Sequence, residues 1–167
     1  MREILFRGKR TDNGEWVEGY YYKAKYCRTD DELCDYITVP HPKEYNEPSS
    51  HYIVDPDTVG QYTGLKDKNG TKIFEGDIIR YSDSGEYEMY LESLECPEEY
   101  DGINFENMWT IDEVVYGTAT NYPAFDLNRH DWEVNGLSNL SESGCYFYEV
   151  IGNIHDNPEL LGGNNNG

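Results

Sequence analysis

The chain opens with a short alternation of apolar and polar residues that is typical of a β-strand. Residues 2–7 alternate in this way, residues 11–14 read Thr-Asp-Asn-Gly, and residues 16–22 return to a strand pattern. Asn-Gly readily adopts the positive φ angles that a tight turn between antiparallel strands requires. The first 22 residues therefore predict a β-hairpin.

Residues 23–57 show no long periodic pattern. Prolines interrupt them, which excludes a long helix because proline lacks a backbone N–H and clashes with the preceding turn. These prolines are Pro40, Pro42, Pro48 and Pro56. We expect this stretch to be irregular, with one short candidate strand at residues 36–39.

Residues 60–81 carry the clearest pattern, three short apolar segments separated by turn residues. Asn69-Gly70 predicts the first turn and Glu75-Gly76-Asp77 the second. Three strands joined by tight turns form a meander, which is the arrangement of small barrels. The residues that we assign to turns or close backbone approaches are Gly60, Gly64, Asn69, Gly70, Gly76, Asp77 and Gly152.

Residues 82–112 form an acidic insert whose pattern fits two structures. At helical spacing an apolar stripe spans two turns, and Pro97 would end the helix. That stripe consists of Tyr87, Tyr90, Leu91 and Leu94. At strand spacing, Tyr87, Met89 and Leu91 share one face opposite glutamates. We favour a helix over residues 84–95 because both of its ends are marked by capping and breaking residues.

The remaining elements are short. Strand patterns return at residues 113–116, 124–127 and 146–151, and Asn157-Pro158 predicts the start of a short helical turn. We expect an all-β or β-rich fold, a small meander or SH3-like barrel built from residues 1–22, 58–81 and 113–161. Residues 1–161 would form a single domain with the insert at 82–112, followed by a disordered tail at 162–167.

Charge divides the chain sharply. The formal net charge is -20, and 12 of the 13 Lys and Arg residues lie at or before Arg80. Residues 1–80 carry a net charge of about -3 and residues 81–167 about -17. The acidic half argues against a phosphate-backbone binder and against a polybasic membrane contact, and it permits basic partners.

The beginning of the chain shows no apolar run that could serve as a signal peptide or a membrane span, so we expect a cytoplasmic protein. In that reducing compartment the four cysteines are expected to be free thiols. They are Cys27, Cys34, Cys96 and Cys145.

Three segments of the chain have a distinctive sequence. They are residues 2–8 (REILFRG), residues 58–79 (TVGQYTGLKDKNGTKIFEGDII) and residues 148–161 (YEVIGNIHDNPELL). In this order the chain resembles the YopX family, small proteins of bacteriophages, prophages and their bacterial hosts. The resemblance implies a mainly β protein with a barrel-like core that forms oligomers. It assigns no catalytic or ligand residues, so no site is carried over to this sequence.

The sequence offers only weak evidence for a catalytic or metal-binding site. Cys27, Cys34, His41 and His51 are ligand-type residues, but their spacing does not match a zinc knuckle. Asp67-x-Asn69-Gly70 begins like a calcium loop, yet the twelfth position is Ile78 instead of glutamate. The adjacent carboxylates could serve a hydrolase only if held across a cleft. They are Asp30-Asp31-Glu32, Glu98-Glu99 and Asp112-Glu113. We predict no catalytic residue, no metal site and no cofactor.

The insert also interleaves acidic and aromatic residues, a combination suited to docking a basic protein. The candidate interaction residues are Glu86, Tyr87, Glu88, Tyr90, Glu92, Glu95, Glu98, Glu99, Tyr100 and Asp101. We expect a non-enzymatic protein-binding or assembly module that forms a homo-oligomer or binds a basic protein.

Two alternatives stay open. One is a hydrolase that depends on carboxylates or a cation. The other is a weak binder of single-stranded nucleic acid that uses the less acidic half. The residues of the second alternative are Arg2, Arg7, Lys9, Arg10, Trp16 and nearby tyrosines. The charge of the whole chain makes nucleic acid the least favoured partner, and we expect no membrane partner.

Overall fold

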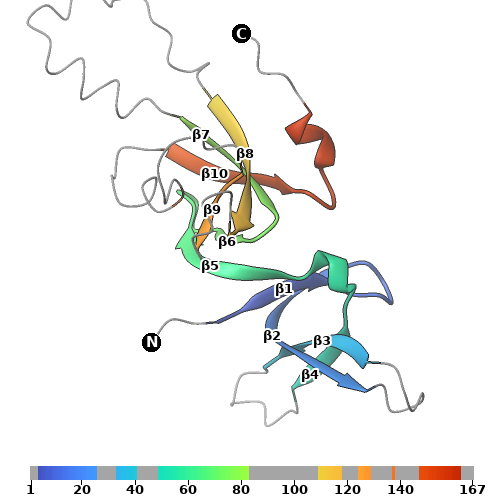
Figure 1. The fold of residues 1–167 in the computed structure, drawn as a ribbon. Coiled ribbons are helices and arrows are strands. Elements are labelled where there is room, and N and C mark those ends of the chain that lie inside the picture. Colours follow the sequence, from blue (N-terminus) through green and yellow to red (C-terminus); the bar gives the residue numbers. More distant parts are fainter. Residues whose placement is uncertain are drawn as a thin grey trace, which may run out of the picture. The chain divides into compact units, whose positions relative to one another are not determined.

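The structure, a computed structural model, describes residues 4–25, 33–40, 49–82, 109–117, 124–128, 137 and 147–162. These residues are mostly β-structure and divide into two compact units, Met1–Gly64 and Leu65–Gly167 (Figure 1). The predicted all-β class is therefore confirmed, and the extent of a single domain stays a prediction. Among the described residues, no helix is long and apolar enough to cross a membrane.

The first unit begins with the expected hairpin. Strand β1 (Phe6–Lys9) pairs antiparallel with β2 (Trp16–Lys25), and Lys9 faces Trp16 at the turn end. Gly14 has a φ angle of 74°, so the Asn-Gly signal does mark the residue that needs a left-handed conformation.

The region expected to be irregular contains two strands. Strand β3 (Leu33–Val39) pairs antiparallel with β2, and β4 (Ser50–Ile53) pairs antiparallel with β3. The candidate strand at residues 36–39 is confirmed as the end of β3, whereas the expectation of irregular structure was wrong for residues 33–35 and for β4, because prolines exclude only helices. The four residues of β4 (SHYI) carry too little apolar contrast to show a strand pattern, and pairing with β3 supplies their backbone partners.

One residue of a single helical turn fixes the chain between β4 and β5. The 3₁₀ turn η2 (Pro56–Thr58) precedes strand β5 (Gly60–Lys66). The buried Thr58 hydroxyl accepts the backbone N–H of Lys9 at 2.9 Å and donates to the carbonyl of Asp55 at 2.7 Å. Strand β5 then pairs antiparallel with β1.

The core of the first unit lies on one face of its sheet. Ile37 and Val54 are 0% and 1% exposed, and Leu5 is also buried. Gly8 and Gly19 allow this close packing, since a Cβ atom at Gly19 would lie 2.1 Å from the carbonyl oxygen of Thr38. The opposite face of β2 is the open one, because side chains alternate across a strand.

The sheet has the strand order β4-β3-β2-β1-β5-β6, with β5 continuing from the first unit into the second. In the second unit, β6 (Lys72–Phe74) returns after the predicted turn at Asn69-Gly70, where Gly70 has a φ angle of 83°. The hairpin is closed by a hydrogen bond from Asp67 N to Thr71 O at 2.9 Å.

A second antiparallel sheet has the order β10-β7-β8-β9. Its strands are β7 (Asp77–Ser82), β8 (Trp109–Tyr116), β9 (Phe125–Leu127) and β10 (Phe147–Asn153). The main core of the second unit consists of buried side chains from β6, β7, β8 and β9 together with Leu137. These residues are Ile73, Ile79, Tyr81, Val114, Leu127 and Leu137.

The described strands do not close into the expected barrel. They form two open antiparallel sheets, because β1 and β2 pair with β3 and β5, whereas β7 pairs with β8 and β10. The expected meander is also wrong at its third strand. Strands β5 and β6 are neighbours, but the turn at Gly76 directs β7 into the second sheet.

Three of the glycines assigned to turns or close backbone approaches lie in strands. Gly60 opens β5, Gly64 lies within β5 with a φ angle of 93°, and Gly152 lies in β10 at a register irregularity. At Gly152 the need is close approach, since a Cβ atom there would lie 2.6 Å from Asn157 Oδ1. Gly76 does lie in a turn, with a φ angle of 80°, and is followed by Asp77 as the first residue of β7.

Strands overlap the expected acidic insert, residues 82–112, at both of its ends, since β7 includes Ser82. Residues 109–112 belong to strand β8, so β-structure begins four residues earlier than residue 113. The helix expected over residues 84–95 lies outside the described residues. The expected helical turn near the end of the chain is present as the 3₁₀ turn η5 (Pro158–Leu161), and residues 163–167 of the expected tail are not described.

Candidate functional site

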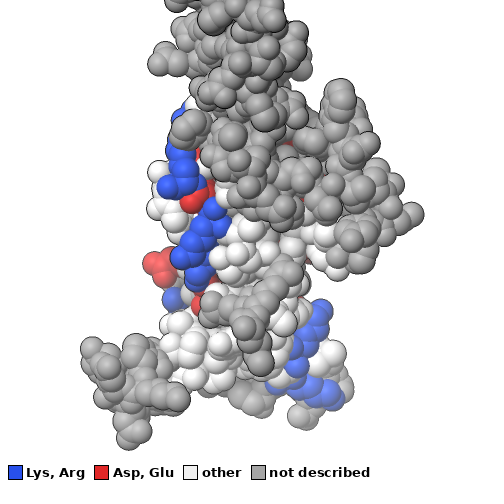
Figure 2. Space-filling view, turned by 90° about the vertical axis from the view of Figure 1, so that its left-hand side faces the viewer, with Lys and Arg blue, Asp and Glu red and all other residues white. Residues whose placement is uncertain are grey.

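The acidic residues proposed for protein interaction, from Glu86 to Asp101, all lie outside the described residues. The described residues contain 9 Lys and Arg and 15 Asp and Glu, so the others hold 4 and 18 of these and carry -14 of the net -20. On the face drawn in Figure 2, Lys and Arg occupy more of the described surface than Asp and Glu. The described part is thus much less acidic than the chain as a whole.

The structure describes two of the four candidate metal ligands. Cys27 and His41 lie outside it, Cys34 lies in β3 and His51 lies in β4. Within the described ranges, no group of three or more His, Cys, Asp or Glu residues could hold a metal ion.

The carboxylate pair of Asp112 and Glu113 points in two directions, as neighbours on strand β8 must. Asp112 is 1% exposed, and its Oδ1 accepts the backbone N–H of Glu113 at 2.8 Å. Glu113 accepts a hydrogen bond from the side chain of Asn128 at 3.1 Å. The other two acidic runs lie outside the described residues.

Asp67 has a structural role in the β5–β6 hairpin. Its Oδ1 accepts the backbone N–H groups of Asn69 and Thr71, each at 2.8 Å, and its Oδ2 accepts that of Val150 at 3.1 Å. Both carboxylate oxygens are thus engaged by backbone groups of the second unit.

The most distinctive surface is the open face of the first sheet. It begins at the hairpin of β1 and β2, where the Arg7 guanidinium carbon lies 4.6 Å and Lys9 Nζ 5.6 Å from the centre of the Trp16 ring. Both distances fall within the range of cation–π interactions. Two positive charges are therefore gathered at one tryptophan.

Tyrosines continue the same face along β2. Tyr20 is 50% exposed and Tyr22 is 37% exposed. They follow Trp16 at even spacing on β2, so all three side chains project to the same side. Glu18 lies between them on this side and faces Arg7 across the strand pair.

Neighbouring strands extend this aromatic surface. The rings of Tyr22 and Tyr36 are stacked, with centroids 5.1 Å apart and an interplanar angle of 13°. His51 Nδ1 lies 3.0 Å from the Tyr22 hydroxyl and 2.9 Å from the Thr38 hydroxyl. We call the set Arg7, Lys9, Trp16, Tyr20, Tyr22 and Tyr36 the open face.

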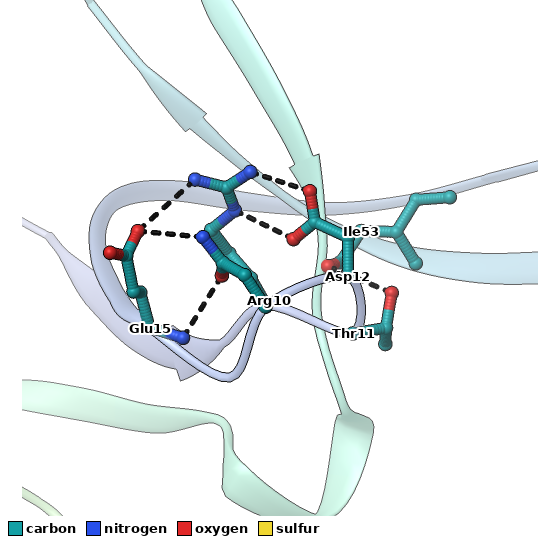
Figure 3. A network of polar contacts seen from close by, with 6 residues as sticks. Arg10, Thr11, Asp12, Glu15 and Ile53 are labelled. Carbon is teal, nitrogen blue, oxygen red and sulfur yellow. Dashed lines mark hydrogen bonds and ion pairs between the residues drawn. The ribbon is translucent and has the colours of Figure 1, made fainter.

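Arg10 does not belong to the open face, although it follows Lys9 in sequence. Figure 3 shows its guanidinium between two carboxylates of the β1–β2 turn. Its Nε donates to Asp12 Oδ1 at 2.8 Å, and its Nη1 lies 3.5 Å from Glu15 Oε2. This contact lowers the pKa of Asp12, chiefly through the hydrogen bond from Arg10. The guanidinium also lies over the Tyr52 ring, 4.3 Å from its centre.

The core side of β2 holds a second satisfied cluster. The Tyr21 hydroxyl donates a hydrogen bond to Asp35, which is 8% exposed, and Lys23 Nζ lies 3.3 Å from the same carboxylate. Burial and then the Asp35 carboxylate raise the pKa of Tyr21, and the hydrogen bond with Asp35 raises the pKa of Lys23. Lys23 therefore serves to hold β2 and β3 together.

The second unit has its own tryptophan with cations, but a carboxylate lies among them. The Arg80 guanidinium carbon lies 4.7 Å from the centre of the Trp109 ring, and Arg80 Nε donates to Glu149 Oε1 at 2.5 Å. Lys68 Nζ lies 2.9 Å from Glu149 Oε2. Hydrogen bonds from Lys68 and then from Arg80 lower the pKa of Glu149, outweighing the effect of burial.

Only some of the residues proposed to bind single-stranded nucleic acid lie together in the structure. It brings Arg7, Lys9 and Trp16 together, places Arg10 in the turn, and does not describe Arg2. Sequence reasoning missed the contribution of Tyr36 and His51. The even spacing of Trp16, Tyr20 and Tyr22 was a readable signal for a shared aromatic face.

Comparison with known proteins gives three results. A model of the YopX protein family matches residues 5–162, nearly the whole chain. A search of curated proteins gave no match. Among solved structures, the crystal structure of protein EF1440 from Enterococcus faecalis is similar, with 26% sequence identity and a TM-score of 0.47, covering 96% of this chain and 99% of that one.

Proposed function

The chain belongs to the YopX family, and we propose that it is a phage or prophage binding protein without catalytic chemistry of its own. Its partner is a macromolecule that docks on the open face of the first sheet. The observation that carries this proposal is the exposure of Tyr20, at 50%, on the face that also holds Trp16 and Tyr22.

Large aromatic side chains at the surface support binding because they bury much apolar area when a partner covers them. Tyrosine and tryptophan also lose little side-chain entropy on docking, since each has only two rotatable bonds. The stacked pair of Tyr22 and Tyr36 restricts these rings further before any partner arrives. The open face is therefore well organised for binding.

A photo-crosslinking amino acid at position 20 tests the proposal in the natural host cell. We expect covalent adducts of the full chain at position 20. The matched control is the same amino acid at position 116, because Tyr116 is 51% exposed but lies in the second unit. No adduct at position 20, or the same adducts at both positions, would contradict the proposal.

The charge division supports a second candidate, in which the acidic residues between Glu86 and Asp101 dock a basic protein or contribute to a homo-oligomer. The observation behind it is the net charge of about -17 over residues 81–167. Native mass measured at low and high salt tests it in host extract and with purified chain. We expect assemblies larger than the monomer that depend on salt, and a monomer at both salt concentrations would contradict this candidate.

A further inference from the structure

The open face combines flat aromatic rings with two cations, and these are the two features that single-stranded nucleic acid needs from a protein surface. We propose that the open face binds single-stranded DNA or RNA, with bases stacking on Tyr20 and Tyr22 and the backbone reaching Arg7 and Lys9. The inference rests on the proposed function, because it names the partner of the same face.

The aromatic part of the argument depends on ring access. Tyr20 and Tyr22 are 50% and 37% exposed, and residues two apart on one strand lie about 6.8 Å apart along it. Bases are planar and can stack on such rings whatever their sequence. Bases in a duplex are already stacked on each other, so this surface favours a single strand.

The cationic part lies at one end of this aromatic row. Arg7 and Lys9 both lie over the Trp16 ring, 4.6 Å and 5.6 Å from its centre. Stacking uses the flat side of a guanidinium, whereas its N–H donors lie in its plane and suit phosphate oxygens. A backbone that leaves the tyrosines along β2 would meet both cations beside Trp16.

The charge of the whole chain argued against nucleic acid at the sequence level, but the charge near this face is different. Asp12 and Glu15 contact Arg10, and Asp35 contacts Lys23. Glu18 is the acid on the same side of β2 as the tyrosines. We therefore expect weak binding, because Glu18 lies on the same side as the rings, and no sequence preference, because stacking does not read base edges.

Fluorescence anisotropy with the full chain and labelled oligonucleotides of 20 thymidines or 20 uridines tests the inference. With two phosphate contacts on a single strand, affinity should fall about sevenfold between 50 and 200 mM salt. A duplex of the same length should bind less tightly than the single strand. Equal binding of duplex and single strand, or no binding at 50 mM salt, would overturn the inference.

Two pairs of variants locate the site. Tyr20→Ser should weaken binding about tenfold by removing one stacking platform, whereas Tyr116→Ser should leave it unchanged. Lys9→Gln should lower the salt effect to about 2.6-fold, whereas Lys25→Gln removes a charge from the opposite side of β2 and should leave it at about sevenfold. Far-ultraviolet circular dichroism confirms that each variant is folded. Equal losses within either pair would overturn the inference.

The two proposals fail separately. If position 20 gives protein adducts in the host and the oligonucleotides do not bind, the open face is a protein-binding surface and the nucleic-acid inference is wrong. If the oligonucleotides bind as expected and adducts at position 20 disappear with nuclease, both proposals are supported. Absence of adducts at position 20 contradicts the proposed function, whereas oligonucleotide binding measures the inference directly.

Discussion

The Asp67 carboxylate accepts the backbone N–H of Val150 at 3.1 Å, although the two residues are 83 positions apart. The same carboxylate also accepts the N–H groups of Asn69 and Thr71 in its own turn. One side chain thus shapes the β5–β6 hairpin and attaches it to β10, within the second unit.

We expect Asp67→Ala to lower the free energy of unfolding by about 3 kcal/mol, because three backbone donors lose a charged acceptor. Asp67→Asn should cost about half as much, since an amide retains one carbonyl oxygen but turns an NH₂ group toward Val150. Chemical denaturation measures both. The control Asp57→Ala, at an exposed residue of η2, should change stability by less than about 0.5 kcal/mol. Equal effects at the two positions would contradict the role of Asp67.

Position 19 has no room for a side chain, so a glycine is required there. A Cβ atom there would lie 2.1 Å from the Thr38 carbonyl oxygen, so Gly19→Ala must separate β2 from β3 and should cost about 3 kcal/mol. Gly70→Ala has no heavy atom within 4 Å of its new Cβ but has a φ angle of 83°, so it should cost only about 1 kcal/mol. Denaturation midpoints compare the two. A larger loss for Gly70→Ala would show that backbone conformation outweighs packing.

Ile79 is 0% exposed within the core of the second unit. We expect Ile79→Ala to cost about 3 kcal/mol, because it removes buried methyl groups and leaves a cavity. Ile4→Ala makes the same chemical change at a residue that is 58% exposed and should cost less than about 0.5 kcal/mol. Thermal unfolding of the two variants checks the difference. Similar losses would mean that Ile79 is not packed as described.

Stability should decrease in acid through Glu149. Hydrogen bonds from Lys68 and Arg80 lower its pKa in the folded state, so it stabilises the fold above the unfolded pKa of about 4.3. That stabilisation is lost as the pH falls from there through the lower folded pKa. We expect Glu149→Gln to cost about 1 kcal/mol at pH 7 and nothing at pH 2.

Denaturation curves at pH 7, 5, 4, 3 and 2 measure this effect. Glu159→Gln is the control, because Glu159 lies at an exposed position of η5. A constant difference between wild type and Glu149→Gln across these pH values would contradict the role of the ion pairs.

Local sequence was sufficient for features that depend on neighbouring residues. The Asn-Gly dipeptides predicted the turns at Gly14 and Gly70, and both glycines have the positive φ angles that such turns require. The period-two pattern of residues 16–22 predicted a strand that the structure extends to Lys25. The sequences of three segments indicated the YopX family, to which the chain belongs.

Pairing between distant strands was decided only by the tertiary structure. No local pattern shows that β7 joins β8 and β10, because strand partners are selected by complementary burial over the whole sheet. For the same reason the sequence could not place Tyr36 against Tyr22 or His51 beside its hydroxyl. The sequence by itself determined the β1–β2 and β5–β6 hairpins, the class of fold and the division of charge. Folding decided which strands meet, and thereby gathered aromatic and basic side chains on the open face.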